Sequence, residues 1–221
     1  MCGRYNIVDG SFTRTLLEAL GVPGHLETRY NIAPTESVPV IRNTPEGREI
    51  SHTLWWLIPS WAPEPGTKYS MFNARAETLT KSRAFRHPFK QQRCIMPASS
   101  FIEWHIEDGK QPYEISAIDR ALVFAGIWDH WGEGAELIYS CSMITTEAVP
   151  ELQHIHNRMP LMLSQDMIGQ WLDPCVTGEE LLPLLEPQLT TSLIVTPVDR
   201  WINSSRHKDP PRVIAAGKII G

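Results

Sequence analysis

The chain begins Met1-Cys2-Gly3-Arg4, and its second residue combines two nucleophiles. A small residue at this position permits removal of the initiator methionine, which leaves Cys2 with a free α-amine beside its thiol. The reference pKa values of these groups are about 8 and about 8.5, so a useful fraction of both is nucleophilic near neutral pH. An aldehyde condenses with such an amine to an imine, and the thiol then closes a thiazolidine ring on the imine carbon. A cysteine at position 2 is usually an accident of the start codon, so this chemistry needs support from the rest of the chain.

That support comes from seven segments that occur together in a fixed order. They are MCGRY (1–5), RYNIAP (29–34), WLIPSWA (56–62), NARAET (73–78), RCIMPA (93–98), FIEW (101–104) and IHNRMP (155–160). Together they resemble the motifs of the SRAP (SOS response-associated peptidase) family, over nearly the whole chain. The resemblance implies one SRAP domain over residues 1–221 and a sensor of abasic sites in single-stranded DNA. It also implies a covalent thiazolidine crosslink through Cys2 after loss of Met1, by autoproteolysis or by a housekeeping aminopeptidase, and no cofactor.

The resemblance assigns catalytic roles to three side chains besides Cys2. Asn73 is implied to hold the new N-terminal amine, and Glu103 to shuttle protons while the imine forms and reverses. His156 is implied to help open the abasic sugar to its aldehyde, because imidazole titrates near neutrality. His154 lies two residues earlier, but the residues that match the family pattern surround His156. We do not expect the two histidines to bind a metal.

The resemblance also implies a groove for the DNA strand. Phosphate contacts are expected from four arginines, whose guanidinium groups donate in a fixed fork: Arg4, Arg75, Arg83 and Arg158. Asn31 and Trp61 are expected near the bases at the lesion, where an indole can stack on an unpaired base. Thr145 matches a position beside the catalytic pocket.

Ordinary structural roles remain open for each of these residues. Asn73 could occupy a turn, Glu103 the polar face of a strand, and His156 a hydrogen-bonded interior position. Trp61 could belong to the core, as most tryptophans do. The arginines could form a solvated surface.

Two other functions also fit parts of the sequence. A class II glutamine amidotransferase or related amidase also begins Met-Cys-Gly and uses the amine as base for the thiol. Such enzymes usually carry a second synthase domain, for which 221 residues leave little room. A non-covalent single-stranded DNA binding module would be indifferent to Cys2.

The distribution of charge favours a local contact with nucleic acid. The formal net charge of −5 argues against a protein that coats nucleic acid indiscriminately. Residues 70–95 nevertheless carry six lysines and arginines against the single acid Glu77. A basic face of this kind attracts phosphates. The four cysteines form no C-x-x-C pair, and no apolar run is long enough to span a membrane, so we expect a cytoplasmic protein that joins the nucleoid when bound to DNA.

The elements that must position these residues are mostly strands. The period of apolar residues predicts a helix over residues 11–20, capped by Ser11 and ended by Gly21, and further helices over 164–172 and 178–185. Asp108-Gly109 predicts a hairpin turn. Strands are predicted at residues 37–42, 50–57, 93–98, 101–106, 113–117, 121–128, 137–144 and 192–198. This pattern indicates an α+β domain built on a curved or barrel-like antiparallel sheet with a few flanking helices.

Overall fold

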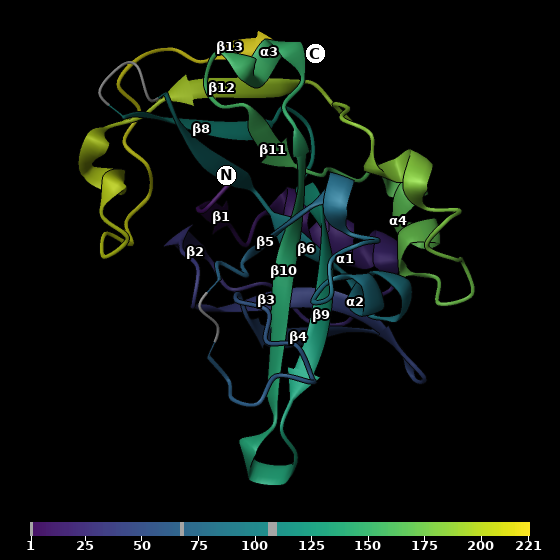
Figure 1. Cartoon of the computed structure of the whole chain (residues 1–221). Helices are drawn as coiled ribbons and strands as arrows, with labels where there is room; N and C mark the ends of the chain where they lie inside the picture. Colours follow the sequence, from purple (N-terminus) through teal and green to yellow (C-terminus); the bar gives the residue numbers. More distant parts are fainter. Residues whose placement is uncertain (1, 67–68, 106–109) are drawn as a thin grey trace.

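The computed structural model describes residues 2–66, 69–105 and 110–221 (Figure 1). Met1 and the predicted Asp108-Gly109 turn lie outside these ranges. The helices are α1 (Ser11–Leu20), α2 (Arg86–Gln91), α3 (Pro150–Gln153) and α4 (Gln165–Leu172). The strands are β1 (Tyr5–Ile7), β2 (Arg29–Ile32), β3 (Ser37–Thr44), β4 (Gly47–Leu54), β5 (Asn73–Arg75), β6 (Arg93–Ala98), β7 (Ser100–His105), β8 (Gln111–Ala117), β9 (Leu122–Trp131), β10 (Ile138–Glu147), β11 (Arg158–Pro160), β12 (Leu193–Pro197) and β13 (Lys218–Ile220).

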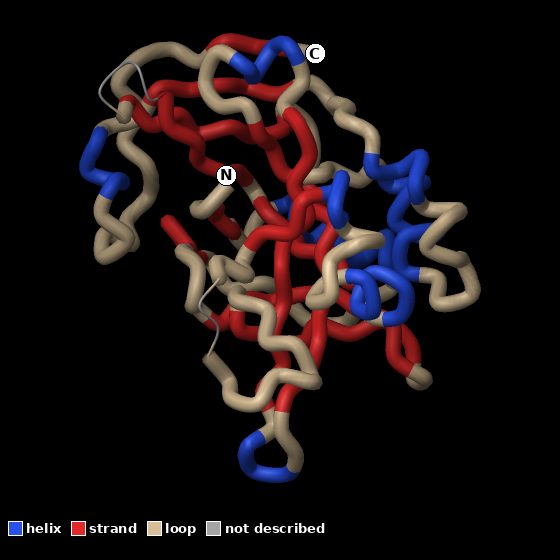
Figure 2. Tube along the Cα trace, in the orientation of Figure 1, coloured by secondary structure: helices blue, strands red, loops and turns tan. Residues whose placement is uncertain are grey.

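The strands form two sheets, and helices lie at their margins (Figure 2). One sheet has the order β13-β12-β8-β7-β1-β2. The other runs β11-β10-β4-β3-β6-β9, and a β9–β10 pairing returns the path to β10, so that this sheet closes on itself. The pairing is antiparallel except where β10 meets β4 and β5. The predicted α+β class is therefore confirmed, with two parallel contacts added to the expected antiparallel sheet.

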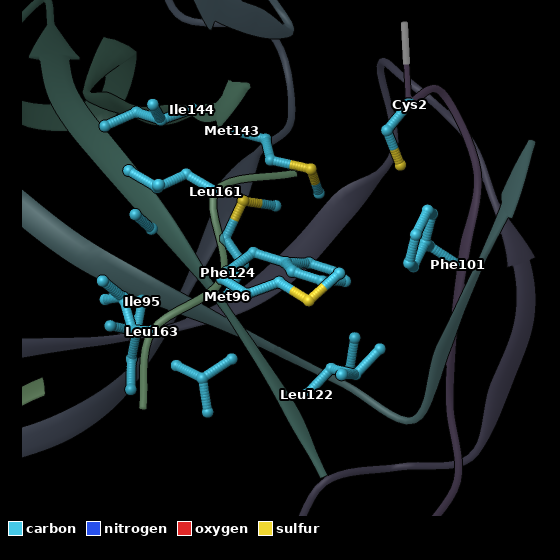
Figure 3. Close-up of a cluster of buried hydrophobic side chains, with 14 of the residues drawn as sticks. Cys2, Ile95, Met96, Phe101, Leu122, Phe124, Met143, Ile144, Leu161 and Leu163 are labelled. Atoms are coloured by element: carbon cyan, nitrogen blue, oxygen red, sulfur yellow. The ribbon is translucent and has the colours of Figure 1, made fainter. Parts of the chain in front are cut away.

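Both sheets contribute to one hydrophobic core. Tyr5 of β1 packs edge-on against Trp55, with ring centroids 5.1 Å apart, and Phe101 of β7 packs against Phe124 of β9 at 5.8 Å. Such edge-to-face pairs add to the free energy of apolar burial. Cys2 belongs to the same buried cluster, and its thiol points into it beside Phe101 (Figure 3). The N-terminal residue of the described chain is thus held inside the fold.

Helix α1 has the predicted bounds but not the predicted cap. Gly10 is the N-cap, and Thr13 rather than Ser11 completes the turn, because its hydroxyl accepts from the Gly10 N–H at 3.1 Å and lies 2.8 Å from the Val8 carbonyl oxygen, to which it donates. Gly21 ends the helix with a φ of 65°, a conformation that favours glycine.

The helix predicted over residues 178–185 is wrong. The structure has only a short 3-10 helix there, Leu182–Leu185. Pro183 explains the failure, because its ring removes a hydrogen-bond donor and clashes with the preceding turn of an α-helix. Within the described ranges, no helix has the length and apolar character needed to cross a membrane.

Candidate functional site

Cys2 and Asn73 are in direct contact. The Asn73 Nδ2 donates to the Cys2 carbonyl oxygen at 2.7 Å, and the Cys2 Sγ donates to the Arg4 carbonyl oxygen at 3.6 Å. Asn73 is fixed because β5 pairs with β10, where it lies opposite Met143. Its Oδ1 is buried and has no hydrogen-bond partner among the described residues. An unsatisfied buried acceptor is costly, so this oxygen is suited to receive an N–H group beside Cys2.

Glu103 and the Cys2 thiol are both held away from water. Burial raises the pKa of Glu103 to about 7. Burial also raises the pKa of Cys2 well above its ordinary value, and the charge of Glu103 raises it further. The resting thiol is therefore neutral at neutral pH, whereas the carboxyl group titrates there. This combination suits a carboxylate that accepts and returns protons during a reaction.

His156 follows α3 and faces the same small pocket as Glu103, which Phe101 and Arg158 also line. Its Nδ1 accepts from the Arg158 backbone N–H at 2.9 Å. Burial is the main cause of a lowered pKa for His156. The structure thus brings the predicted carboxylate and imidazole to one pocket.

Arg158 and Thr145 are joined across the ladder between β10 and β11. The Arg158 Nη2 donates to the Thr145 carbonyl oxygen at 2.6 Å, and the guanidinium forms a two-pronged ion pair with Glu77 at 2.6 and 3.1 Å. Thr145 is buried and also lies opposite Arg75 in the pairing of β10 with β5. Strand β10 therefore sets the spacing of Arg75, Thr145 and Arg158.

An open groove adjoins the small pocket. Arg75, His156 and Arg158 line it, together with Gln153, Asn157 and Glu147. His156 and Arg158 border both the groove and the pocket that contains Glu103. An extended ligand bound in the groove would therefore lie directly beside His156 and close to the pocket that contains Glu103.

Trp61 and Arg83 form a separate pair. The Arg83 guanidinium lies over the Trp61 ring, 4.0 Å from its centroid, and half of Trp61 is exposed. Trp61 is thus not a core residue, and its indole remains accessible for stacking.

Arg4 and Asn31 contact each other directly. The Arg4 Nη1 donates to the Asn31 Oδ1 at 2.8 Å, and the Arg4 guanidinium lies 5.6 Å from the Trp104 ring centroid. Asn31 is fully buried with a φ of 51°, and its amide donates to three backbone carbonyl groups of the 202–207 segment. The side chain expected near the bases is therefore occupied by contacts within the chain.

Two residues of the site escaped the sequence analysis as functional groups. Glu77 neutralises Arg158, and its position as the single acid in a basic segment was the available signal. The Trp104 ring contacts the Arg4 guanidinium, and its Nε1 donates to the Asn203 Oδ1 at 2.6 Å. Local sequence patterns do not predict either contact. Among the described residues, no group of three or more histidine, cysteine or acidic side chains could hold a metal ion.

Comparisons with known proteins agree on one family. The sequence model described as SOS response associated peptidase (SRAP) matches residues 1–205. The chain is 36% identical to the abasic site processing protein YoaM of Bacillus subtilis, over 94% of this chain and 95% of that protein. It is 30% identical to the abasic site processing protein HMCES of Mus musculus, over 86% of this chain and 66% of that protein. A crystal structure of a Bacteroides thetaiotaomicron protein matches the fold with a TM-score of 0.80 at 24% identity, covering 92% of this chain and 95% of that one.

Proposed function

This chain belongs to the SOS response associated peptidase (SRAP) family, and we propose that it processes abasic sites by capturing them covalently in single-stranded DNA through Cys2. The relatives named abasic site processing proteins support the substrate. The observation that carries the chemistry is the contact of Asn73 with Cys2, because the buried Asn73 Oδ1 is positioned to accept from the amine that loss of Met1 would create.

The proposed reaction begins with the sugar. His156 donates a hydrogen bond to the ring oxygen of the abasic deoxyribose, which favours its open aldehyde form. The Cys2 amine adds to the aldehyde carbon, and water leaves as the imine forms. Glu103 supplies the proton that converts the leaving hydroxyl to water.

The second stage closes the ring. The nitrogen of the imine has kept its last proton, so the Cys2 sulfur adds to the carbon of the protonated imine while the thiol proton passes to the Glu103 carboxylate left by the first stage. One carbon–sulfur bond forms and the carbon–nitrogen double bond becomes single, so no oxidant or reductant is needed. The raised pKa of the buried thiol makes this proton transfer necessary, and the Glu103 pKa of about 7 makes it feasible at neutral pH.

DNA is proposed to reach the site along the open groove. Arg75 is exposed and lines the groove, and Arg4 follows Cys2 in the chain and contacts Asn31. The Arg158 guanidinium already donates to Glu77 and to the Thr145 carbonyl oxygen. A DNA phosphate would therefore compete with Glu77 for the Arg158 guanidinium. Trp61 and Arg83 offer an exposed ring and a cation to a nearby nucleotide.

The test is covalent capture. Purified protein is mixed with a single strand that carries one abasic site, boiled in detergent and separated by size, while the mass of the free chain reports whether Met1 is present. A boiling-resistant product that maps to Cys2 is expected with the abasic strand and not with the intact strand. Cys175→Ser, which removes an exposed thiol, is the matched control and should react normally.

Two results would redirect the assignment. A complex that forms with abasic DNA but dissociates on boiling would favour a non-covalent DNA binding module. Release of ammonia from glutamine, with no effect of DNA, would favour an amidase of the glutamine amidotransferase type.

A further inference from the structure

The segment of residues 199–212 is a basic loop in an acidic chain. It carries four lysines and arginines against two aspartates, whereas the whole chain has a formal net charge of −5. Asp199 caps the 3-10 helix Arg200–Asn203 by accepting from the Trp201 N–H, and Lys208 is paired with Glu36. Part of the loop lies beyond residue 205, where the family match ends.

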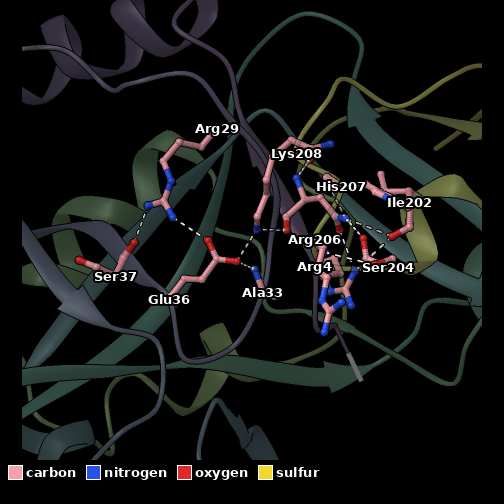
Figure 4. Close-up of polar contacts among 12 residues, drawn as sticks. Arg4, Arg29, Ala33, Glu36, Ser37, Ile202, Ser204, Arg206, His207 and Lys208 are labelled. Carbon is pink, nitrogen blue, oxygen red and sulfur yellow. Dashed lines mark hydrogen bonds and ion pairs between the residues drawn. The ribbon is translucent and has the colours of Figure 1, made fainter.

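This basic loop is built into the fold beside Arg4 (Figure 4). The Asn31 Nδ2 donates to the carbonyl groups of Ile202, Ser204 and His207 at 3.1, 2.9 and 2.9 Å. The Arg4 Nη1 donates to the same Ile202 carbonyl group at 3.2 Å. The Ile202 side chain is buried in a small apolar cluster. Asn31 and Arg4 therefore hold the loop in a fixed position.

The loop presents a preformed aromatic stack. The rings of Trp201 and His207 lie parallel, with centroids 3.5 Å apart and an interplanar angle of 6°, and the His207 Nδ1 lies 2.6 Å from the Trp201 carbonyl oxygen. The Arg212 guanidinium lies 5.0 Å from the Trp201 ring centroid. Trp201 is 42% exposed, so the stack is accessible at the surface.

Two exposed arginines belong to the same loop as this stack. Arg206 and Arg212 are exposed, and Arg206 lies in the same cluster of polar contacts as Arg4 (Figure 4). A flat aromatic group beside arginines suits the unpaired bases and phosphates of a single strand. An acidic peptide would find the same charge but would not need the stacked rings.

The loop and the groove are both connected to Cys2 through neighbouring residues. Cys2 accepts a hydrogen bond from Asn73, and Arg75, two residues after Asn73, lines the groove. Cys2 is also followed two residues later by Arg4, which contacts the loop. The groove and the loop are thus each linked to the candidate nucleophile through a different neighbouring residue.

We propose that residues 199–212 form a second binding surface for single-stranded DNA, which takes the nucleotides on one side of the lesion. Arg206 and Arg212 contact phosphates, and the Trp201–His207 stack takes an unpaired base. This inference rests on the proposed function and adds a fixed orientation of the DNA strand across the protein. Nucleotides on the opposite side of the lesion contact Arg75 and its neighbours in the groove.

The experiment uses two short single strands that carry a stable abasic analogue without an aldehyde, one at the 5′ end and one at the 3′ end. Binding is measured over a range of salt concentrations for the wild type, for Arg206→Ala/Arg212→Ala and for Trp201→Leu. We expect each variant to lose affinity on the order of tenfold for one of the strands and to bind the other normally. The double variant should also lower the salt slope by about two for the affected strand.

Arg120→Ala is the matched control, because Arg120 is an exposed arginine paired with Asp119 between β8 and β9. It should leave both strands unaffected. Unchanged binding of both strands by the loop variants, or an equal loss for both, would overturn the inference. The proposed function is tested separately with aldehyde-bearing strands: a wild type that never crosslinks but shows the fixed strand orientation would refute covalent capture and leave the loop surface intact.

Discussion

The Arg158 backbone N–H donates to the His156 Nδ1 at 2.9 Å and thereby selects the tautomer of the imidazole. A backbone amide can only donate, so the proton of the neutral ring resides on Nε2. Burial lowers the pKa of His156, which favours this neutral form at neutral pH. The ring is therefore prepared to donate a hydrogen bond rather than to act as a base.

Variants at His156 can separate these two roles. His156→Ala should slow crosslinking by about 10²–10⁴-fold, the range typical of proton-transfer groups. His156→Gln should recover part of the rate, because its amide retains a donor. Time courses with abasic single strands measure both, and His154→Ala, an exposed neighbour, should react normally. Equal rates for the Ala and Gln variants would show that a hydrogen-bond donor is not sufficient.

The raised pKa of Glu103 predicts a cost in stability. The folded state keeps the Glu103 proton up to about pH 7, whereas the unfolded chain releases it near 4.5. The wild type therefore loses stability as pH rises between these values and stays destabilised above 7. Glu103→Gln should increase the free energy of unfolding at pH 8 by about 1–3 kcal/mol, with little change below pH 4.5. Denaturant titrations at both pH values measure this, and a variant that is less stable at pH 8 would contradict the assigned pKa shift.

Glu103 should also shape the rate of capture. Its carboxylate form, which accepts the thiol proton during ring closure, increases as pH rises through about 7, so the ring-closing step of wild-type crosslinking should accelerate over that range. Glu103→Ala should be slower and should retain only the dependence due to the N-terminal amine, whose reference pKa is about 8. The DNA affinity of the variant, measured with the aldehyde-free analogue, should be unchanged. An unaltered pH profile of the rate would remove Glu103 from the mechanism.

Cys2→Ser tests the order of the two bond-forming steps. The variant keeps the amine but replaces the thiol with a weaker nucleophile, so it should form an imine without closing a stable ring. Borohydride should trap the imine as a permanent linkage, while boiling without borohydride should release the DNA. A boiling-resistant product from the untreated variant would contradict ring closure by sulfur.

Arg75 of the groove and Arg83 beside Trp61 should both act through phosphate contacts. Arg75→Ala and Arg83→Ala should weaken binding of single strands and reduce the salt slope by about one each, with little effect on sequence preference. Arg14→Ala, an exposed arginine paired with Asp9 on α1, is a suitable control. If affinity and salt slope stay at wild-type values in both variants, these arginines form only a solvated surface.

Two glycines give a matched test of packing. A Cβ added at Gly126 would lie 2.9 Å from the Cys94 Sγ and 3.3 Å from the Met96 Cγ, whereas one at Gly169 of α4 would meet no atom within 4 Å. Gly126→Ala should therefore destabilise the protein by about 1–3 kcal/mol. Gly169→Ala should stabilise it by about 0.5–1 kcal/mol through helix propensity. Thermal melting compares the two, and a neutral Gly126→Ala would show that β6 can move away from β9.

The long elements were predictable because their patterns are local. The bounds of α1 and β6 match the predicted residues 11–20 and 93–98, since each combines a clear apolar pattern with a defined end. Strands β5 and β11 were missed, because three residues are too few to show a period. These are the strands that carry Asn73, Arg75 and Arg158, so the motif resemblance singled out candidate residues in strands that periodicity could not predict.

The features of the candidate site that the sequence did not predict depend on contacts between residues far apart in the chain. Glu77 and Arg158 are 81 positions apart, and Asn31 contacts a loop more than 170 positions away. No spacing rule encodes such pairs. The sequence could therefore single out Asn31 and Arg4 as candidate DNA-binding residues. That both residues hydrogen-bond to the 199–212 loop could be learned only from the structure.

Strand β10 pairs with β4, β5, β9 and β11, and its last residues face Asn73, Arg75 and Arg158. Opening this one strand would separate the groups beside Cys2 from those along the groove in a single event. Amide hydrogen exchange in Met143–Glu147 should consequently report the same opening free energy as β5 and β11, in one cooperative unit. Damage to that unit would disrupt the proposed groove and the proposed reaction centre together, so local unfolding of β10 would not leave the groove contacts in place without the groups beside Cys2.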